Sequence, residues 1–452
     1  MRPKTPPEGA AARTRSHAAR TIAAVSTTVP PPTQLRGSLA RVLGGGGRRL
    51  VRIVVALPAL PVVALAAALA RIDTRQRRRR GSLPRLVWGP EPIISIKYWS
   101  SALQGRGFTS RTCVWTHYPI NQRSDFDRDA DSFLPGGAAF DPLRAYAMFL
   151  WAIAVSDIYM SFFDGGFLRG TALRRLELPL LRLAGKAIVV SSYGSDTAVP
   201  GHLGVAEARL LEDYPSIARN GTRVRRRVLQ FARWANVIVR NLQFGFLPRW
   251  DVVWPTMVAL DTEAWAPLRS VPEETDEDRE VVVVHASNHR AIKGTDELLA
   301  AIEQLQRDGL RVRLELLERR PNDEVRSAVQ RADIVAEQFI AGYGLFAIEG
   351  MSMGLPVLSA LSWLPTDLMK NLRRRGCPIV DTDLGNLVEN LRALVADSAR
   401  RRAIGAASRQ FALEHHSYDA AARSWEAIIR HVWNGEPLPR ELLGENPGSA
   451  MS

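Results

Sequence analysis

Hydrophobic and polar positions divide the chain into a long body of alternating strand and helix patterns that begins near Leu83. Short apolar runs recur there, and most lead through a turn into a stretch with helical spacing of apolar positions. This alternation is typical of parallel α/β domains, because parallel strands need a crossover connection that is usually a helix. The runs predicted as strands are Arg85–Trp88, Thr112–Trp115, Asp157–Phe163, Ala187–Ser192, Val237–Val239, Val252–Trp254, Val281–Val284, Val312–Leu317, Asp333–Val335 and Pro356–Leu358.

A proline- and acid-rich stretch interrupts the alternation around residues 261–275. Stretches of this composition commonly link domains. We therefore predict two Rossmann-like parallel-sheet domains that face each other across a cleft, at 83–268 and 276–412. The last long helix, roughly Ser398 to Trp433, should bridge them through its end at 413–435, and a tail at 436–452 follows.

Residues 1–82 form a basic, low-complexity extension. The formal net charge of the chain is +14, and residues 1–80 hold 16 Lys plus Arg against two acidic residues, so the remaining body is neutral. A neutral body argues against nucleic-acid binding. Residues 1–47 are rich in Ala, Arg, Pro and Gly and are predicted to be disordered.

An uncharged hydrophobic segment at 53–70 interrupts this extension and has arginines on both sides. Its 18 residues reach the length at which a membrane-spanning helix becomes a candidate, but Pro58 and Pro61 would kink a short helix. A shallow anchor on an anionic membrane surface, through residues 48–80, and a disordered extension are the alternatives. We expect a cytoplasmic protein, and the anchor would attach it to the inner face of the cell membrane.

A glycine-rich turn before a helix is the strongest local motif, and it runs from Ala341 to Glu349. Gly342 and Gly344 let backbone amides approach a ligand at the entry to a helix, whose N-terminus favours phosphate oxygens. One turn into the helix, Glu349 can accept hydrogen bonds from the two hydroxyls of a ribose.

A second motif follows the strand at 281–284 and includes His289, Arg290 and Lys293 before Gly294. The two cations lie in the turn that leads to a helix, so both can converge on a diphosphate at the carboxyl edge of the sheet. A diphosphate leaving group requires such neutralisation.

Taken together, these motifs resemble the retaining, metal-independent glycosyltransferases of the GT-B fold in family four, also called glycosyl transferases group 1. The resemblance covers about Leu86 to Trp433. The matching positions are Lys293-Gly294, Gly342-Tyr343-Gly344-Leu345, Glu349, Met351, Gly354, Pro356-Val357, Gly194-Ser195-Asp196 and Trp254-Pro255. The earlier of two glutamates typical of the family would fall at Ala341, and Glu337-Gln338 resembles an Asp-Gln pair of one branch.

This resemblance implies transfer of a sugar from a nucleotide-sugar donor to a glycan or lipid-linked acceptor, with retention, without metal and without a cofactor. Arg290 and Lys293 would stabilise the leaving diphosphate. The donor-binding residues would be His289, Gly342, Tyr343, Gly344, Leu345 and Glu349.

Acceptor-side candidates follow the strands of the first domain. Gly89 lies in the first strand-to-helix turn, where a permissive backbone lets ligands come close. Asp164 is the candidate for orienting the acceptor, and His117 is its rival at the end of another strand. Ser195 and Asp196 belong to the loop that matches the family motif.

Metal ligation and disulfide chemistry find little support in the chain. Asp125-x-Asp127 is interpreted as a loop, and Asp381-x-Asp383 as a helix cap, rather than as a metal motif. Two cysteines cannot form a disulfide framework and suit a reducing compartment. The rival interpretation is a catalytically silent GT-B-shaped nucleotide-binding or scaffold protein.

Overall fold

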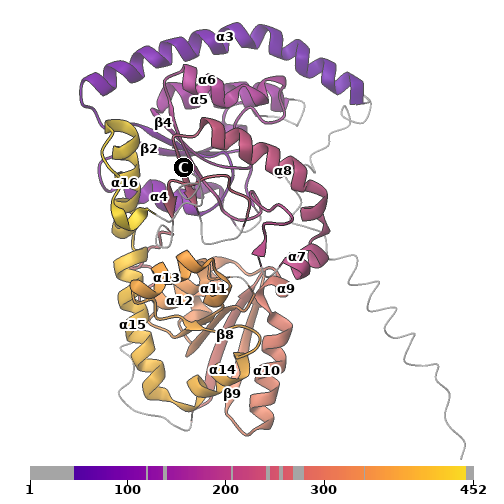
Figure 1. Ribbon diagram of the computed structural model, residues 1–452, viewed down its shortest axis with the longest axis vertical. Coiled ribbons are helices and arrows are strands. Elements are labelled where there is room, and N and C mark those ends of the chain that lie inside the picture. The colour runs from indigo at the N-terminus through magenta and orange to yellow at the C-terminus, as the bar shows by residue number, and fades with distance from the viewer. Residues whose placement is uncertain are drawn as a thin grey trace, which may run out of the picture.

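The computed structural model describes residues 45–118, 121–135, 140–204, 207–240, 245–253, 258–267, 279–340 and 342–443. Within this part the chain forms two parallel sheets with helices around them, which confirms the predicted pair of α/β domains (Figure 1). Of residues 1–47, which were predicted to be disordered, residues 1–44 lie outside the described residues, as do the Trp254-Pro255 match and the position of Ala341. Residues 45–47 begin helix α3 (Gly45–Arg79), so the predicted disorder is wrong there.

The first sheet has seven strands in the order β3-β2-β1-β4-β5-β6-β7, and every pairing is parallel. Central strands β4 and β5 are buried along their whole length, as expected for strands covered on both faces. The strands are β1 (Leu86–Trp88), β2 (Ser110–Val114), β3 (Arg128–Asp129), β4 (Ile158–Phe162), β5 (Ala187–Ser191), β6 (Val237–Arg240) and β7 (Val252–Val253). The helices of this domain are α4 (Ser95–Gln104), α5 (Asp141–Val155), α6 (Glu177–Leu183), α7 (Glu207–Asp213) and α8 (Pro215–Trp234).

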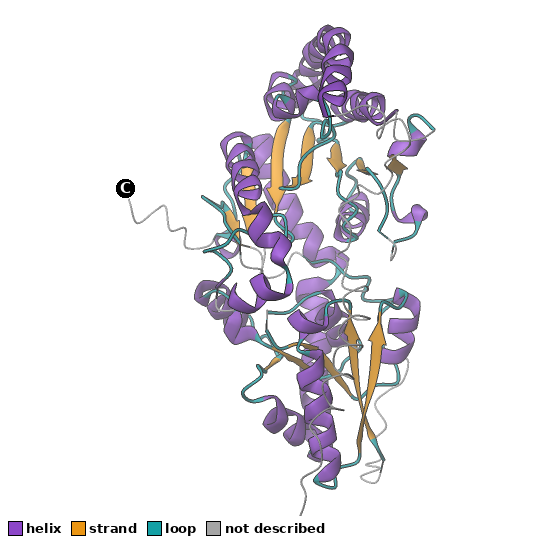
Figure 2. Cartoon of the chain, turned by 90° about the vertical axis from the view of Figure 1, so that its right-hand side faces the viewer, coloured by secondary structure: helices purple, strands orange, loops and turns teal. Residues whose placement is uncertain are grey.

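The second sheet has five parallel strands in the order β12-β11-β10-β8-β9. Its strands are β8 (Val281–Ser287), β9 (Val312–Glu318), β10 (Ile334–Gln338), β11 (Val357–Ser359) and β12 (Val380–Asp381). The helices are α9 (Arg290–Lys293), α10 (Thr295–Arg307), α11 (Asn322–Val329), α12 (Leu345–Ser352), α13 (Thr366–Arg374), α14 (Leu387–Ala396) and α15 (Ser398–His416). In Figure 2 the strand arrowheads of both sheets point toward the region between the domains.

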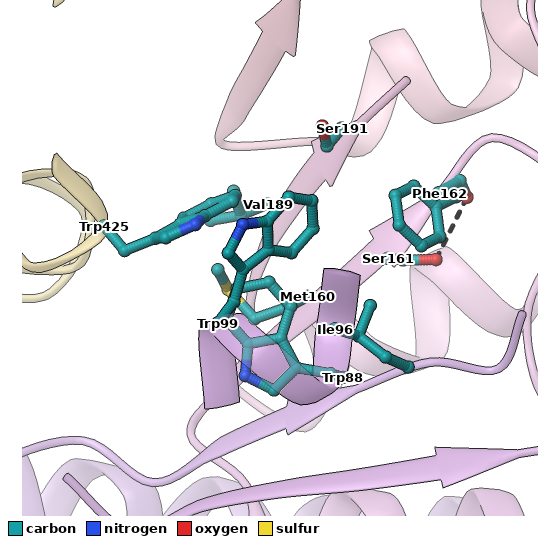
Figure 3. A pocket seen from close by; sticks show the side chains of 9 residues that line it. All are labelled: Trp88, Ile96, Trp99, Met160, Ser161, Phe162, Val189, Ser191 and Trp425. Carbon is teal, nitrogen blue, oxygen red and sulfur yellow. Dashed lines mark hydrogen bonds between the residues drawn. The ribbon is translucent and has the colours of Figure 1, made fainter. Parts of the chain in front are cut away.

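The predicted last helix is two helices. The first, α15, ends at His416, and α16 (Tyr418–Asn434) begins after Ser417, whose extended backbone and side chain cap the new helix. Helix α16 returns to the first domain, where Trp425 packs against Trp88 and Trp99 at ring-centroid distances of 4.9 and 5.0 Å (Figure 3). The chain therefore crosses between the domains at this break.

The hydrophobic segment at 53–70 lies within helix α3 (Gly45–Arg79), which runs across the end of the first domain farthest from the second (Figure 1). One face of α3 joins the core of that domain through Val63, Ala67 and Ala70. Part of the basic extension is thus an ordered helix that packs against α5 and α6.

Candidate functional site

Lys293 lies at the end of the single-turn helix α9, directly after β8, and Gly294 ends that turn in the left-handed conformation. The ammonium Nζ lies 3.0 Å from Oε1 of Glu337, which is at the carboxyl end of β10. The two side chains are 17% and 3% exposed, so this is a largely buried ion pair. The other carboxylate oxygen of Glu337 is buried and has no hydrogen-bond partner among the described residues. The pair therefore leaves an unsatisfied acceptor beside the cation.

Helix α12 begins beside this pair, and its first turn has no side-chain cap. Gly342 has φ +53, and an added Cβ would lie 2.6 Å from a methyl carbon of Leu364. An added Cβ on Gly344 would lie 3.4 Å from Oε1 of Glu337, so the backbone passes close to the carboxylate. The uncapped amides of α12 and the ammonium of Lys293 together favour an anion at this sheet edge.

Glu349 is buried on α12, and its Oε1 accepts a hydrogen bond from Nδ2 of Asn322 at 3.1 Å. Burial raises the pKa of Glu349 to about 8, and the charge of nearby Glu337 adds to the rise. The side chain therefore favours the protonated form near neutral pH in the empty protein. Its predicted role toward a ribose stays a prediction.

Arg290 and Lys293 do not share a partner in this structure. The Arg290 guanidinium pairs with Asp296 at 2.5 Å and with Glu318 at 2.8 Å. Its side chain is 41% exposed, so it has room to reorient. The expected convergence of the two cations on one anion would require Arg290 to leave these carboxylates.

Two histidines near Lys293 in the sequence, His289 and His285, make structural contacts. His289 Nδ1 lies 3.2 Å from the Tyr214 hydroxyl of the first domain, and burial lowers the pKa of His289. His285 is fully buried between the carbonyl of Ala336 and the hydroxyl of Thr295, each at 2.8 Å, and burial lowers its pKa to about 3. His289 thus contacts the opposite domain, whereas His285 helps to hold the sheet to α10.

The side chain of Tyr343 lies in the core, and its predicted role in donor binding stays a prediction. Its ring is buried in the core, in an edge-on contact with His416 at 6.2 Å between centroids. A ligand at the sheet edge would therefore not meet this side chain. Leu345 is the first residue of α12 and remains half-buried there.

In the first domain, Gly89 occupies the tight turn after β1. Its φ is +150, and an added Cβ would lie 2.0 Å from the carbonyl oxygen of Cys113, so any larger residue would collide with the backbone. Glu91 follows and is buried in an ion pair with Arg169, and burial raises its pKa despite that arginine. Sequence reasoning missed Glu91 and Arg169, although a carboxylate two residues after a strand-end glycine is a recognisable pattern.

Asp164 follows β4 and is held from two sides. It accepts a hydrogen bond from the Tyr193 hydroxyl and pairs with Arg227 at 2.6 Å. Together with the Glu91–Arg169 pair, these residues form what we call the acceptor-side cluster: Glu91, Asp164, Arg169, Tyr193 and Arg227. The charges of Asp164 and Arg227 both act on the pKa of Glu91, so the two pairs lie near one another.

Asp196 and Ser195 have different environments in the same loop. Asp196 is fully buried and accepts backbone hydrogen bonds from Phe163, Tyr193 and Gly194 at 3.2, 3.0 and 2.9 Å. Burial, reinforced by the charge of Asp164, raises the pKa of Asp196 to about 7. Asp196 therefore positions the loop, while Ser195 is exposed.

His117, the rival of Asp164, is tied to a neighbouring loop. Its Nε2 lies 3.1 Å from Asp129, which also pairs with Arg123 at 3.0 Å. The other ring nitrogen, Nδ1, is buried without a partner among the described residues. The contacts of His117 therefore hold the loop after β2 and do not reach the acceptor-side cluster.

The two domains meet beside the candidate site. Arg209 of α7 pairs with Glu297 of α10 at 2.9 Å. Leu210 of α7 packs in one small apolar cluster with Ile340 of the second domain. These contacts place the end of β8 and the start of α10 against the first domain.

The Asp-x-Asp strings have ordinary structural contacts. Asp125 pairs with Lys97 at 2.6 Å, and Asp127 accepts from the backbone and hydroxyl of Thr112. Asp383 accepts from the backbone of Gly385, but the N-cap of α14 is Asn386, so the helix-cap interpretation is wrong. The described residues include no group of three or more His, Cys, Asp or Glu side chains arranged to hold a metal ion.

No protein-family model matches the chain. A 175-residue stretch is 30% identical to D-inositol 3-phosphate glycosyltransferase of Corynebacterium diphtheriae, and the match covers 36% of this chain and 38% of that protein. The relative is a glycosyltransferase, which confirms the resemblance to glycosyltransferases; retention and metal independence stay predictions. The chain spans less than half the length of this curated relative.

Solved structures with similar architecture include a glycosyltransferase from Rickettsia africae, with a TM-score of 0.45 and 10% identity over 78% of this chain and 98% of that chain. Another is the glycosyltransferase SnogD from Streptomyces nogalater, with a TM-score of 0.35 and 14% identity over 76% of this chain and 99% of that chain. With scores this low, the argument for function rests on the site itself.

Proposed function

We propose that the protein is a glycosyltransferase that moves a sugar from a nucleotide-sugar donor to a glycan or lipid-linked acceptor. The observation that carries the proposal is the combination at one sheet edge of the Lys293 ammonium, the uncapped start of α12 and the buried Glu349. The motif resemblance and the curated glycosyltransferase relative support it.

On the donor side, the leaving diphosphate would lie against Lys293 and the first amides of α12. Charge develops on the leaving oxygen as the bond to the sugar breaks, and preorganised donors in a partly buried site stabilise that charge. Without a ligand, the Glu337 carboxylate forms an ion pair with Lys293, so an incoming diphosphate competes with this carboxylate for the ammonium group. Arg290 would add a second cation after leaving Asp296 and Glu318.

The acceptor-side cluster would face the transferred sugar from the first domain. Asp164 has its two oxygens held by Tyr193 and Arg227, which leaves its carboxylate in a defined position to receive a hydrogen bond from an acceptor hydroxyl. Gly89 and Glu91 line the adjacent turn, where the absence of a Cβ on Gly89 keeps the backbones in contact.

Finer features of the proposal come from the resemblance. Transfer would proceed with retention and without metal, since Lys293 and helix amides supply the charge stabilisation that a metal provides in other transferases. No cofactor would be needed beyond the donor itself. The protein would act in the cytoplasm at the inner face of the cell membrane.

The test is a binding and hydrolysis screen of the full chain against nucleoside diphosphates and nucleotide sugars, with and without EDTA. We expect a base-selective rise in melting temperature and slow, EDTA-resistant release of sugar, with product anomers assigned by NMR. Inversion would contradict retention, and loss of turnover in EDTA would contradict metal independence. Binding without any sugar release to water or acceptor would favour the silent nucleotide-binding protein instead.

A matched set of variants assigns the site. Lys293→Ala alone leaves Glu337 buried without its partner, which costs about 3–5 kcal/mol of stability. The double variant Lys293→Gln/Glu337→Gln removes both charges together, and it should fold yet bind nucleoside diphosphates at least tenfold more weakly. Lys370→Ala removes an exposed lysine on α13 and should change neither property. Full binding by the double variant would overturn this assignment.

A further inference from the structure

The outer face of helix α3 is apolar over several turns, although it faces away from the protein. Leu57, Leu65 and Leu69 are 70%, 63% and 59% exposed, and Val54 and Ile72 extend the same face. These positions recur at helical spacing, so the side chains form one stripe along the helix. A stripe of this kind is not expected to face water, because a surface helix normally presents polar residues there.

The opposite face of α3 is packed against the first domain by small residues. Ala56, Val63, Ala67 and Ala70 are buried, and they contact the core beneath α5 and α6. Leu143 of α5 and Leu183 of α6 are also exposed, and these helices pack directly against α3.

Polar contacts fasten the C-terminal half of α3 to the amino edge of the first sheet. Asp157, fully buried at the start of β4, accepts from Thr74 at 3.2 Å and pairs with Arg77 at 3.1 Å. Burial alone would raise the pKa of Asp157, but hydrogen bonds and charge from Arg85 outweigh it and hold the pKa below its usual range. Buried Lys186 donates to the Thr74 hydroxyl at 2.7 Å. Pulling α3 away would therefore remove Thr74 and Arg77 from Asp157 and Thr74 from Lys186, and Arg85 would remain as a partner of Asp157.

The charged residues around α3 indicate what kind of surface would cover its apolar stripe. Residues 45–80 contain nine arginines and one acidic residue, Asp73, and the arginines lie at both ends of the apolar segment. Arg75, Arg79 and Arg80 are exposed beside the end of the stripe. A hydrophobic face bordered by arginines is complementary to a bilayer with anionic headgroups.

We propose that α3 is an in-plane membrane anchor, whose Val54–Ile72 stripe lies in the interface of an anionic bilayer while the helix stays docked on the first domain. By length and composition the helix could cross a membrane, but crossing the bilayer would break its contacts with Asp157 and Lys186. The anchor does not depend on the transfer reaction proposed above.

The anchor also sets where the candidate site lies. Asp157 is at the amino end of β4, whereas Asp164 follows its carboxyl end, and five residues of strand span about 17 Å. The site is therefore held on the far edge of the sheet from the bilayer. If the proposed transfer is correct, its acceptor reacts through a group that extends at least about 17 Å from the membrane surface.

The test is co-flotation of the full chain with sealed vesicles of phosphatidylcholine, with or without 30% phosphatidylglycerol. We expect binding to the anionic vesicles that weakens with salt, and at least tenfold weaker binding of the variant Leu65→Glu/Leu69→Glu. The control Leu443→Glu changes a similarly exposed leucine outside α3 and should bind like the unmodified chain. Circular dichroism and melting temperature confirm folding of each variant.

Besides a membrane span, which is tested last, two outcomes would overturn the proposal. One is equal binding by the double variant, and the other is a dimer in the absence of vesicles that the double variant abolishes, which would assign the stripe to a second copy of the chain. Topology is tested with the variants Arg48→Cys and Arg79→Cys, each in a Cys377→Ser background, where Cys113 is buried. Both should react with an impermeant maleimide added outside the vesicles, whereas protection of one end would show a span.

Discussion

Replacing Glu337 by glutamine tests whether its carboxylate competes with a diphosphate for Lys293. Glu337 and Lys293 form a largely buried pair with 3.0 Å between Oε1 and Nζ. At an effective dielectric constant of about 20, two unit charges at this distance attract by about 5.5 kcal/mol. Desolvation offsets much of this, and a hydrogen bond to a charged group contributes about 1.5–3 kcal/mol net. A diphosphate that takes Lys293 from Glu337 must overcome that amount.

Glu337→Gln should therefore tighten the binding of a nucleoside diphosphate by about tenfold to a hundredfold, since each tenfold corresponds to about 1.4 kcal/mol. The empty variant should melt at a lower temperature than the unmodified protein, because Lys293 loses its partner. Saturating nucleotide should remove most of that difference. Isothermal titration calorimetry and thermal melting measure both effects.

The control is Glu389→Gln, which neutralises an exposed carboxylate on α14 and should leave affinity unchanged. Weaker binding by Glu337→Gln would refute the competition argument, because it would mean that the Glu337 carboxylate itself holds the ligand. Unchanged binding would also refute it, since Lys293 would then not contact the diphosphate.

Three further changes probe the fold and the site. Gly89→Ala should destabilise the protein by about 3 kcal/mol or more in urea denaturation, because its Cβ would lie 2.0 Å from the carbonyl oxygen of Cys113; a loss below 1 kcal/mol would contradict the tight turn. The pKa of Glu349 is raised to about 8, so its contribution to stability is full below about pH 4.5 and declines as pH rises toward 8. Glu349→Gln should lessen this decline by a few kcal/mol when urea midpoints are compared at pH 5 and pH 8, and an unchanged slope would contradict burial of the carboxyl group. Trp425→Ala should cost about 3–5 kcal/mol and loosen α16 from Trp99, measured by denaturation and by amide hydrogen exchange in α16, and retained exchange protection would contradict the packing.

Local patterns in the sequence were sufficient for the architecture. The β-branched run at 281–284 predicted a strand buried on both faces, and β8 is such a strand. The stretch around 261–275 predicted a linker, because proline and clustered acids suit neither a buried strand nor an amphipathic helix, and it falls between β7 and β8 of the two sheets. Two glycines also predicted turns from the local sequence. Gly89 and Gly342 take positive φ at positions where an added Cβ would collide with neighbouring atoms.

The arrangement of side chains in the site depended on contacts between residues far apart in the chain. Lys293 meets Glu337 across 44 positions, and Glu91 meets Arg169 across 78. The spacing of hydrophobic positions along the chain does not predict such pairs, because register and loop geometry decide which side chains share an edge of a sheet. The position of the Tyr343 ring also depends on tertiary packing, because the residue lies in a motif that resembles the family but its ring is buried in the core.

Helix α3 shows most clearly which properties the local sequence determines and which the tertiary structure decides. The sequence by itself determined that the segment at 53–70 is apolar, uncharged and bordered by arginines. Which face is covered was decided only by the tertiary structure, because the buried partners Asp157 and Lys186 lie more than 80 positions away from Thr74. Hydrophobicity is a property of the local sequence, whereas burial is a property of what the folded chain brings against it.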